Sequence, residues 1–247
     1  MVTIVCKKIK FPKIEAIIFD KDGTLQDSQK FLWELGRKRA QIVDAEIPGI
    51  GESLLAAFGI SEDALDPKGL IAVGSRRENE IAAATYIAET GRSWFESLAI
   101  ATKAFAEAEQ YITQRSQSSL IFPGSVEVLK FLFLAGLKLG ILSADSTAGV
   151  EAFVDRHKLF EYIQLTMGVQ GELTKPDPRL FLKACQALEV KPEATIMVGD
   201  SQGDMAMAKA AGAAGAIGIS WGTPEAAHLE TADVAISFLN EIQILES

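Results

Sequence analysis

The chain has 247 residues, and its 24 Lys and Arg against 33 Asp and Glu give a formal net charge of −9. Apolar residues make up 48% of the chain and charged residues 23%, a composition that excludes wholesale disorder. The acidic balance also argues against unaided binding of nucleic acid, which depends on clustered Lys and Arg. The length suits one large domain or a core with an inserted domain.

The sequence predicts a protein of the cytoplasm. Cys6 and Cys185 are too few for a disulfide framework, and neither has a CxxC partner for structural zinc. A few apolar residues precede the first lysines, which is the wrong order for a signal peptide. The longest uncharged stretch, 210–224, is too short and too rich in Gly and Ala to span a bilayer. We therefore expect no membrane partner.

Short apolar runs alternate with helical patterns over much of the chain. Six such runs lead into small, polar or glycine-bearing turns, at 14–19, 137–142, 162–167, 194–198, 215–219 and 234–236. Continuous apolar runs of this length are typical of parallel strands covered on both faces. Apolar residues recur at helical spacing in 125–136, 178–189 and 203–212. The pattern predicts an α/β, doubly wound, Rossmann-like core with a parallel sheet.

One segment interrupts this alternation. Residues 28–120 have little strand character and contain four amphipathic helical patterns, at 31–43, 52–60, 79–90 and 94–114. We expect an inserted α-helical domain at 28–120 and a core assembled from 1–27 and 121–247.

The first predicted strand of the core ends in the sequence FDKDGTLQDS. Asp20 and Asp22 are two residues apart, so in extended backbone they would point to one side, and Gly23 permits a sharp turn. Two carboxylates this close repel each other unless a cation is near or one proton is retained. Oxygen ligands favour a hard cation such as Mg²⁺, whereas a turn with two solvated acids is the alternative.

A second pair of acids follows another predicted strand, in VGDSQGD. Asp200 comes directly after the strand, and Asp204 would lie in the first turn of the next helix. Both acids would otherwise serve as a helix cap and a first-turn charge. Ligands of such sheets bind beyond the carboxyl ends of the strands. Because two strands deliver acids to that edge, a bound cation is the simpler explanation.

Two further polar residues belong to the same edge. Ser143 follows the strand at 137–142 and offers a hydroxyl and loop N–H groups to an anion. Lys175 precedes Pro176, which disfavours helical backbone there, so the lysine should lie in a loop. Its ammonium would balance the carboxylates and bind a phosphate. Alone, either residue would be an ordinary strand-end or surface group.

In this order the four motifs DKDGTLQDS, Ser143, KPDP with Lys175, and GDSQGD resemble those of the haloacid dehalogenase-like hydrolases. The resemblance covers the core end to end, from Phe19 to the terminal strand and helix. It implies that the helical insert is the family's smaller cap, which closes over the site. It also implies a Mg²⁺-dependent phosphatase of the phosphoglycolate-phosphatase-like kind.

The resemblance implies a role for each motif residue. Asp20 would be the nucleophile that forms an aspartyl-phosphate, and Asp22 the general acid and base. Mg²⁺ would be held by the Asp20 carboxylate, the Asp22 backbone carbonyl and Asp200. Asp204 would support the metal's outer shell or orient its neighbours.

Further roles follow for the phosphoryl group. Ser143 and the backbone N–H of Ala144 would bind a phosphoryl oxygen, and Lys175 would neutralise charge on the nucleophile and the transferring group. Related phosphatases often carry Asn or another small polar residue where this chain has Ala144, which is followed by Asp145. The extra acid would either tune substrate or metal affinity or face solvent. Because dehalogenases of the family lack an acid at the Asp22 position, phosphoryl transfer is favoured.

The substrate is expected to be a small phosphorylated metabolite. Arg76 and Arg77 open a predicted helix of the insert and would bind a second anionic group, or pair with Glu78 or Glu80. Two alternatives remain open. One is a mutase resembling β-phosphoglucomutase, and the other is a catalytically idle binding or regulatory protein, against which the intact Asp20, Asp22, Lys175 and Asp200 argue. The sequence leaves the oligomeric state open.

Overall fold

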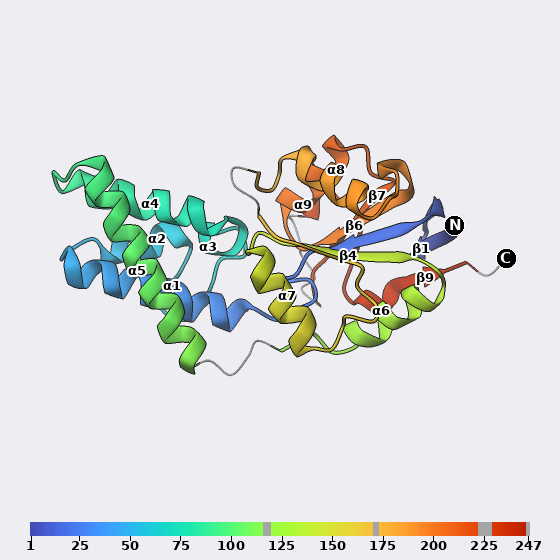
Figure 1. The fold of residues 1–247 in the computed structure, drawn as a ribbon, viewed down its shortest axis with the longest axis horizontal. Helices are drawn as coiled ribbons and strands as arrows, with labels where there is room; N and C mark the ends of the chain where they lie inside the picture. The colour runs from blue at the N-terminus through green and yellow to red at the C-terminus, as the bar shows by residue number, and fades with distance from the viewer. Residues whose placement is uncertain (116–119, 170–172, 222–228, 246–247) are drawn as a thin grey trace. The chain divides into compact units, whose positions relative to one another are not determined.

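The computed structural model describes residues 1–115, 120–169, 173–221 and 229–245 (Figure 1). The chain divides into two compact units, one formed by residues 1–27 and 121–247 and the other by residues 28–120. No helix in the described ranges is long and apolar enough to cross a membrane.

The first unit, called the core unit below, is built on a six-stranded sheet. Its spatial order is β5-β4-β3-β6-β7-β8, and every neighbouring pair is parallel. The strands are β3 (Ala16–Phe19), β4 (Lys138–Leu142), β5 (Leu165–Met167), β6 (Thr195–Gly199), β7 (Gly215–Ile219) and β8 (Val234–Ile236). All six were predicted from their apolar runs, and the predicted α/β, doubly wound fold is confirmed.

Helices cover both faces of this sheet, as Figure 1 shows. Successive β3 side chains alternate between two apolar clusters. Ile17 and Phe19 pack with α6 and α7, whereas Ala16 and Ile18 pack with α8 and α9. The helices are α6 (Ser125–Leu134), α7 (Thr147–Arg156), α8 (Pro178–Ala187) and α9 (Gln202–Ala210), with the short 3₁₀ turns η1 (Pro192–Ala194) and η3 (Leu239–Glu241). Burial on both faces explains why most side chains of these strands are apolar.

A small antiparallel sheet joins the two ends of the chain. Its order is β2-β1-β9, with β1 (Val2–Cys6), β2 (Ile9–Ile14) and β9 (Ile242–Ile244). Ile4, Ile14 and Ile242 bury their side chains in the same apolar cluster as Ile17 and Phe19. The small sheet therefore extends the core on the face that α6 and α7 cover.

The described residues of the second unit, called the helical unit below, form five helices. They are α1 (Gln29–Glu46), α2 (Gly51–Phe58), α3 (Leu70–Val73), α4 (Arg76–Glu89) and α5 (Trp94–Arg115). Each helix contributes buried apolar side chains to one cluster, in which Phe58 and Phe105 meet edge to face. Residues 28–120, where the sequence predicts an inserted helical domain, form a compact unit whose described helices share an apolar cluster of their own.

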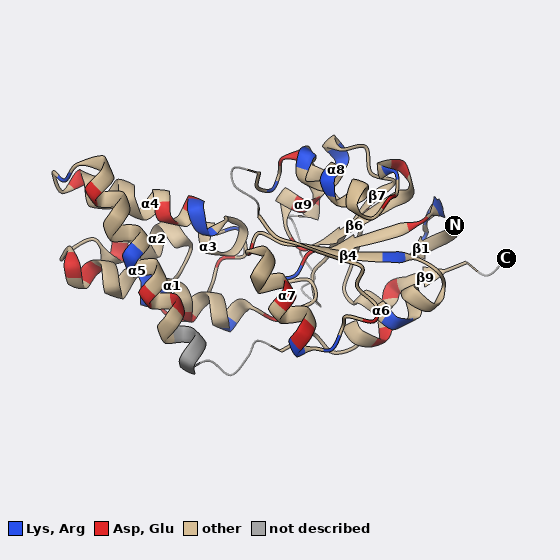
Figure 2. Ribbon diagram, in the orientation of Figure 1, with Lys and Arg blue, Asp and Glu red and all other residues tan. Residues whose placement is uncertain are grey.

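Charged side chains join three helices of the helical unit. Arg39 on α1 is only 4% exposed, and its Nη2 donates to Glu109 Oε1 on α5 at 3.1 Å. The other oxygen of Glu109 accepts from Arg76, at the start of α4. Burial lowers the pKa of Arg39 to about 10 although Glu109 opposes the shift. Figure 2 shows basic and acidic residues adjoining in the first turns of α4. Glu109 therefore neutralises a nearly buried cation.

We expect Glu109→Gln to destabilise the protein by about 1–3 kcal/mol, because Arg39 would remain buried without its counter-charge. Urea denaturation followed by circular dichroism measures the change. Glu107→Gln on the same helix is the matched control, because Glu107 is exposed. Equal losses of unfolding free energy in the two variants would show that the Arg39–Glu109 pair does not stabilise the protein.

Candidate active site

The candidate site lies where the order of the sheet reverses. From β3 the chain first adds β4 and β5 on one side, and then β6, β7 and β8 on the other. Ligands of open α/β sheets bind at such a switch point, beyond the carboxyl ends of the strands. Asp20 directly follows β3 at this position, and its backbone N–H donates to Val198 O on β6 at 2.8 Å.

Strand register places two other predicted residues beside Asp20. Phe19 is level with Ile141 on β4 and with Val198 on β6. Ser143 and Asp200 therefore each lie one residue beyond the level of Asp20, on the two neighbouring strands. The fold brings a hydroxyl to one side of the Asp20 backbone and a carboxylate to the other.

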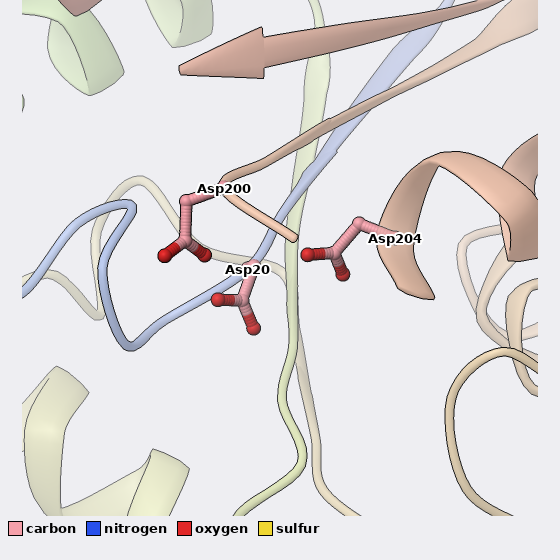
Figure 3. A group of neighbouring side chains, drawn as sticks. All are labelled: Asp20, Asp200 and Asp204. Carbon is pink, nitrogen blue, oxygen red and sulfur yellow. The ribbon is translucent and has the colours of Figure 1, made fainter. Parts of the chain in front are cut away.

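Three carboxylates converge at this edge (Figure 3). Each of Asp20, Asp200 and Asp204 offers one oxygen, and the three oxygens lie within 4.8 Å of one another. Asp20 and Asp204 are buried, with exposures of 5% and 0%. Clustered, desolvated acids of this kind are costly without a cation. The arrangement has the hard oxygen donors that suit Mg²⁺.

Lys175 supplies part of the compensating charge. Its Nζ donates to Asp20 Oδ1 and lies 2.7 Å from Asp204 Oδ1, and its side chain is only 6% exposed. Burial alone would lower the pKa of Lys175, but the carboxylates of Asp20 and Asp204 raise it above its ordinary value. Lys175 is therefore a fixed cation in contact with two of the three acids.

A single lysine does not offset the cost of burying these acids. Burial raises the pKa of Asp20 to about 7, and the charges of Asp204 and Asp22 add to the effect of burial while Lys175 opposes it. Burial also raises the pKa of Asp200 well above its ordinary value, with the charges of Asp20 and Asp204 adding to the shift. A divalent cation would remove this penalty by stabilising the ionised carboxylates.

Two glycines allow the acids to approach so closely. Gly23 has a φ of +79°, and a Cβ there would lie 1.9 Å from Asp200 Oδ2. A Cβ at Gly199 would lie 2.5 Å from the Asp204 carboxylate. The space that these glycines leave free is occupied by carboxylates, which fits a site built to gather oxygen ligands.

The helix start after β6 holds Asp204 in place. Ser201 and Asp204 form a capping box, in which Ser201 Oγ donates to Asp204 Oδ2 at 2.6 Å and accepts from the Asp204 backbone N–H at 3.2 Å. One oxygen of Asp204 thus contacts Ser201, and the other faces Lys175. These contacts favour a role in orienting Lys175.

Asp22 lies outside the three-carboxylate group. Its Oδ2 is 2.7 Å from Lys21 Nζ, and its Oδ1 accepts from Gln26 Nε2 at 3.1 Å. The backbone turns after Asp20, with Gly23 N–H donating to Gln26 O at 2.9 Å. The Asp22 side chain is therefore held beside the carboxylate group by contacts of its own.

Sequence reasoning missed Lys21. Its side chain is 6% exposed and also lies 3.2 Å from Asp145 Oδ2. Burial alone would lower the pKa of Lys21, but the charges of Asp22 and Asp145 raise it. Asp145, for which solvent exposure was one alternative, is 41% exposed and paired with this lysine. The available signal was a lysine between two acids, directly after a strand expected to be buried.

The remaining predicted residues occupy two places. Ser143 is buried, and its Oγ accepts from Asp145 N–H at 3.1 Å, with Ala144 between them in the loop. Arg76 and Arg77 belong to the helical unit, where both approach Glu80, at 2.9 and 3.6 Å. Arg76 also contacts Glu109, so two carboxylates compensate its charge.

Comparison with known proteins identifies the family. The sequence pattern of haloacid dehalogenase-like hydrolases matches residues 14–212. The chain belongs to this family. It is 28% identical to phosphoglycolate phosphatase of Escherichia coli K12 over 251 residues, covering 94% of this chain and 92% of that protein. The predicted membership of the haloacid dehalogenase-like hydrolases is confirmed, as is the predicted relation to phosphatases of that family.

Two solved structures have the same fold. A predicted phosphoglycolate phosphatase from Haemophilus somnus 129PT superposes with a TM-score of 0.65 at 20% identity, covering 92% of this chain and 95% of that one. A putative β-phosphoglucomutase from Thermotoga maritima gives 0.62 at 23% identity, covering 90% and 94%. At these identities the likeness establishes the fold.

We expect Gly23→Ala to weaken Mg²⁺ binding at least about tenfold, because the new methyl group would displace Asp200. Isothermal titration calorimetry measures the affinity. The control is Gly212→Ala, since Gly212 also has a positive φ, +74°, but open space where a Cβ would lie. Unchanged affinity in Gly23→Ala, or an equal loss in both variants, would contradict a cation held by Asp200.

Proposed function

We propose that this protein is a Mg²⁺-dependent phosphatase that hydrolyses a small phosphorylated metabolite through an aspartyl-phosphate. The observation that carries the proposal is the group of Asp20, Asp200 and Asp204 around Lys175 at the switch point of the sheet. The family and the phosphatase names of its full-length relatives agree with this chemistry. Residues 1–27 and 121–247 would form the catalytic core.

The reaction would proceed in two displacements at phosphorus. An Asp20 carboxylate oxygen attacks the phosphorus atom, and the bond from phosphorus to the ester oxygen breaks. Asp22 gives its proton to the departing oxygen, which leaves as an alcohol. Asp22 then accepts a proton from water, whose oxygen attacks the phosphorus of the aspartyl-phosphate, and the bond from phosphorus to the Asp20 oxygen breaks. The products are inorganic phosphate and the regenerated Asp20 carboxylate.

The residues present fit a magnesium ion. The carboxylates of Asp20 and Asp200 would hold it together with the backbone carbonyl of Asp22, and Asp204 would act from the outer shell through Lys175. When bound, the ion supplies positive charge that offsets the carboxylates and the phosphoryl oxygens. Asp20 would then be ionised at neutral pH, as a nucleophile must be.

The loop after β4 and Lys175 would bind the phosphoryl group. The Ser143 hydroxyl and the Ala144 backbone N–H would donate to one phosphoryl oxygen, and Lys175 would balance charge on the transferring group. The buried Asp20–Lys175 pair keeps that ammonium beside the carboxylate that would attack. The ammonium of Lys175 would then both bind the phosphoryl group and keep the Asp20 nucleophile in place.

Phosphoglycolate and similar small phosphate esters are the proposed substrates, on the strength of relatives named phosphoglycolate phosphatase. The helical unit at 28–120 would then act as the cap that determines the substrate. Of its two candidate arginines, Arg77 is the better suited to a substrate anion. It is 53% exposed and 3.6 Å from Glu80, whereas Arg76 contacts both Glu80 and Glu109.

We expect hydrolysis of aryl phosphates and phosphoglycolate in the presence of Mg²⁺ and its loss with chelator. Asp20→Asn should reduce kcat by at least about a thousandfold, because an amide is a poor nucleophile. A phosphate-release assay measures both effects, and Asp27→Asn, in an exposed position of the same loop, serves as the control. Activity that survives chelation or Asp20→Asn would contradict the proposal. Isomerisation of a phosphosugar without phosphate release would indicate a mutase.

A further inference from the structure

A nearly buried lysine, Lys21, separates the two acids of the first motif in the sequence. Lys21 is 5% exposed, and its ammonium contacts two carboxylates, Asp22 Oδ2 at 2.7 Å and Asp145 Oδ2 at 3.2 Å. A buried ammonium is costly unless it is paired in good geometry. A fold stabilised by packing alone would be served by an apolar residue at this position. Packing alone therefore does not explain the lysine, and its contacts with the two carboxylates indicate its role.

Lys21 and Gln26 together fix the carboxylate of Asp22. Lys21 contacts one oxygen, and the amide of Gln26, itself 5% exposed, donates to the other at 3.1 Å. The backbone supports both contacts, because Lys21 O accepts from Gln26 N–H at 2.9 Å. A carboxylate held at both oxygens has lost most of its rotational freedom. Asp22 is therefore preorganised by neighbours in its own loop.

Asp145 anchors Lys21 from the other side. Its Oδ1 accepts from Ser146 N–H at 2.6 Å, and its backbone carbonyl accepts from Val169 N–H at 2.9 Å. The Asp145 N–H donates to Ser143 Oγ. Lys21 thus connects the loop of the proposed acid to the loop of the proposed phosphoryl-binding hydroxyl.

We propose that Lys21, anchored by Asp145, is a positioning residue that holds the Asp22 carboxyl where it delivers a proton to the leaving oxygen. The assignment rests on the proposed phosphatase function and adds to it a residue pair that acts through Asp22. Lys21 is distinct in role from Lys175, which contacts Asp20 and Asp204. Asp145 keeps the ammonium of Lys21 from being an isolated charge.

Leaving groups of different acidity separate this role from a structural one. 2,4-Dinitrophenolate departs without protonation, whereas phenolate needs a proton in the transition state. The value of kcat/KM reports formation of the aspartyl-phosphate, the step in which the leaving group departs. A residue that acts through the general acid therefore affects kcat/KM for phenyl phosphate and not for 2,4-dinitrophenyl phosphate.

The experiment measures kcat/KM of the full chain with Mg²⁺ on both esters. For Lys21→Met we expect a loss of roughly 10- to 100-fold on phenyl phosphate and of less than about threefold on 2,4-dinitrophenyl phosphate. Asp145→Asn should lower kcat/KM on phenyl phosphate by a smaller factor and leave kcat/KM on 2,4-dinitrophenyl phosphate nearly unchanged. If circular dichroism shows that Lys21→Met does not fold, Asp145→Asn provides the test. Lys183→Met, at an exposed position of α8, should match the parent on both esters.

A double-mutant cycle with Asp22→Asn completes the test. If Lys21 acts through Asp22, adding Lys21→Met to Asp22→Asn causes no further loss on phenyl phosphate. Equal losses on both esters, or additive losses in the cycle, would overturn the positioning role. A parent protein without Mg²⁺-dependent activity would instead overturn the proposed function, and the assignment of Lys21 with it.

Discussion

Repulsion between like charges is the constraint on which the site depends. Three carboxylates offer oxygens within 4.8 Å of one another at the edge of a buried sheet, and one ammonium contacts two of them. Burial raises the pKa of Asp20 to about 7, so the group is incompletely ionised near neutral pH without a further cation. The same clustering that makes this edge unstable alone suits it to hold a cation. A phosphate ester would be repelled by these acids until their charge is reversed.

The fold places these charges by means of its backbone. Parallel strands β3, β4 and β6 end at the same edge of the sheet, so residues that are distant in sequence lie side by side there. Glycines at 23 and 199 leave room for the Asp200 and Asp204 carboxylates, and a capping box fixes the first turn of α9. Each of these features is local. Together they hold the carboxylates closer to one another than mutually repelling, solvated side chains would lie.

Features with a strong local signal could be predicted from the sequence. The six sheet strands are mostly apolar because helices cover both faces, so each lies in a predominantly apolar run of the sequence. Strand β2 was missed because its exposed side chains include Lys10 and Lys13, which interrupt the apolar pattern. Helix α3 has only four residues and leaves no periodicity to detect.

Side-chain partners were harder to predict than positions. The sequence analysis assigned no role to Lys21, whose contact with Asp22 depends on the turn of the backbone after Asp20. Arg76 was considered for a substrate anion, and its second partner, Glu109, comes from a helix 33 residues later in the chain. Spacing within one motif carries no information about such tertiary partners.

The most direct test of the account is rapid-quench trapping of the phosphorylated enzyme, followed by peptide mapping by mass spectrometry. We expect covalent phosphate on Asp20 during turnover with Mg²⁺, and none when the metal is removed by a chelator. Turnover without any covalent phosphate on the enzyme, phosphate on a residue other than Asp20, or equal labelling in chelator would contradict it.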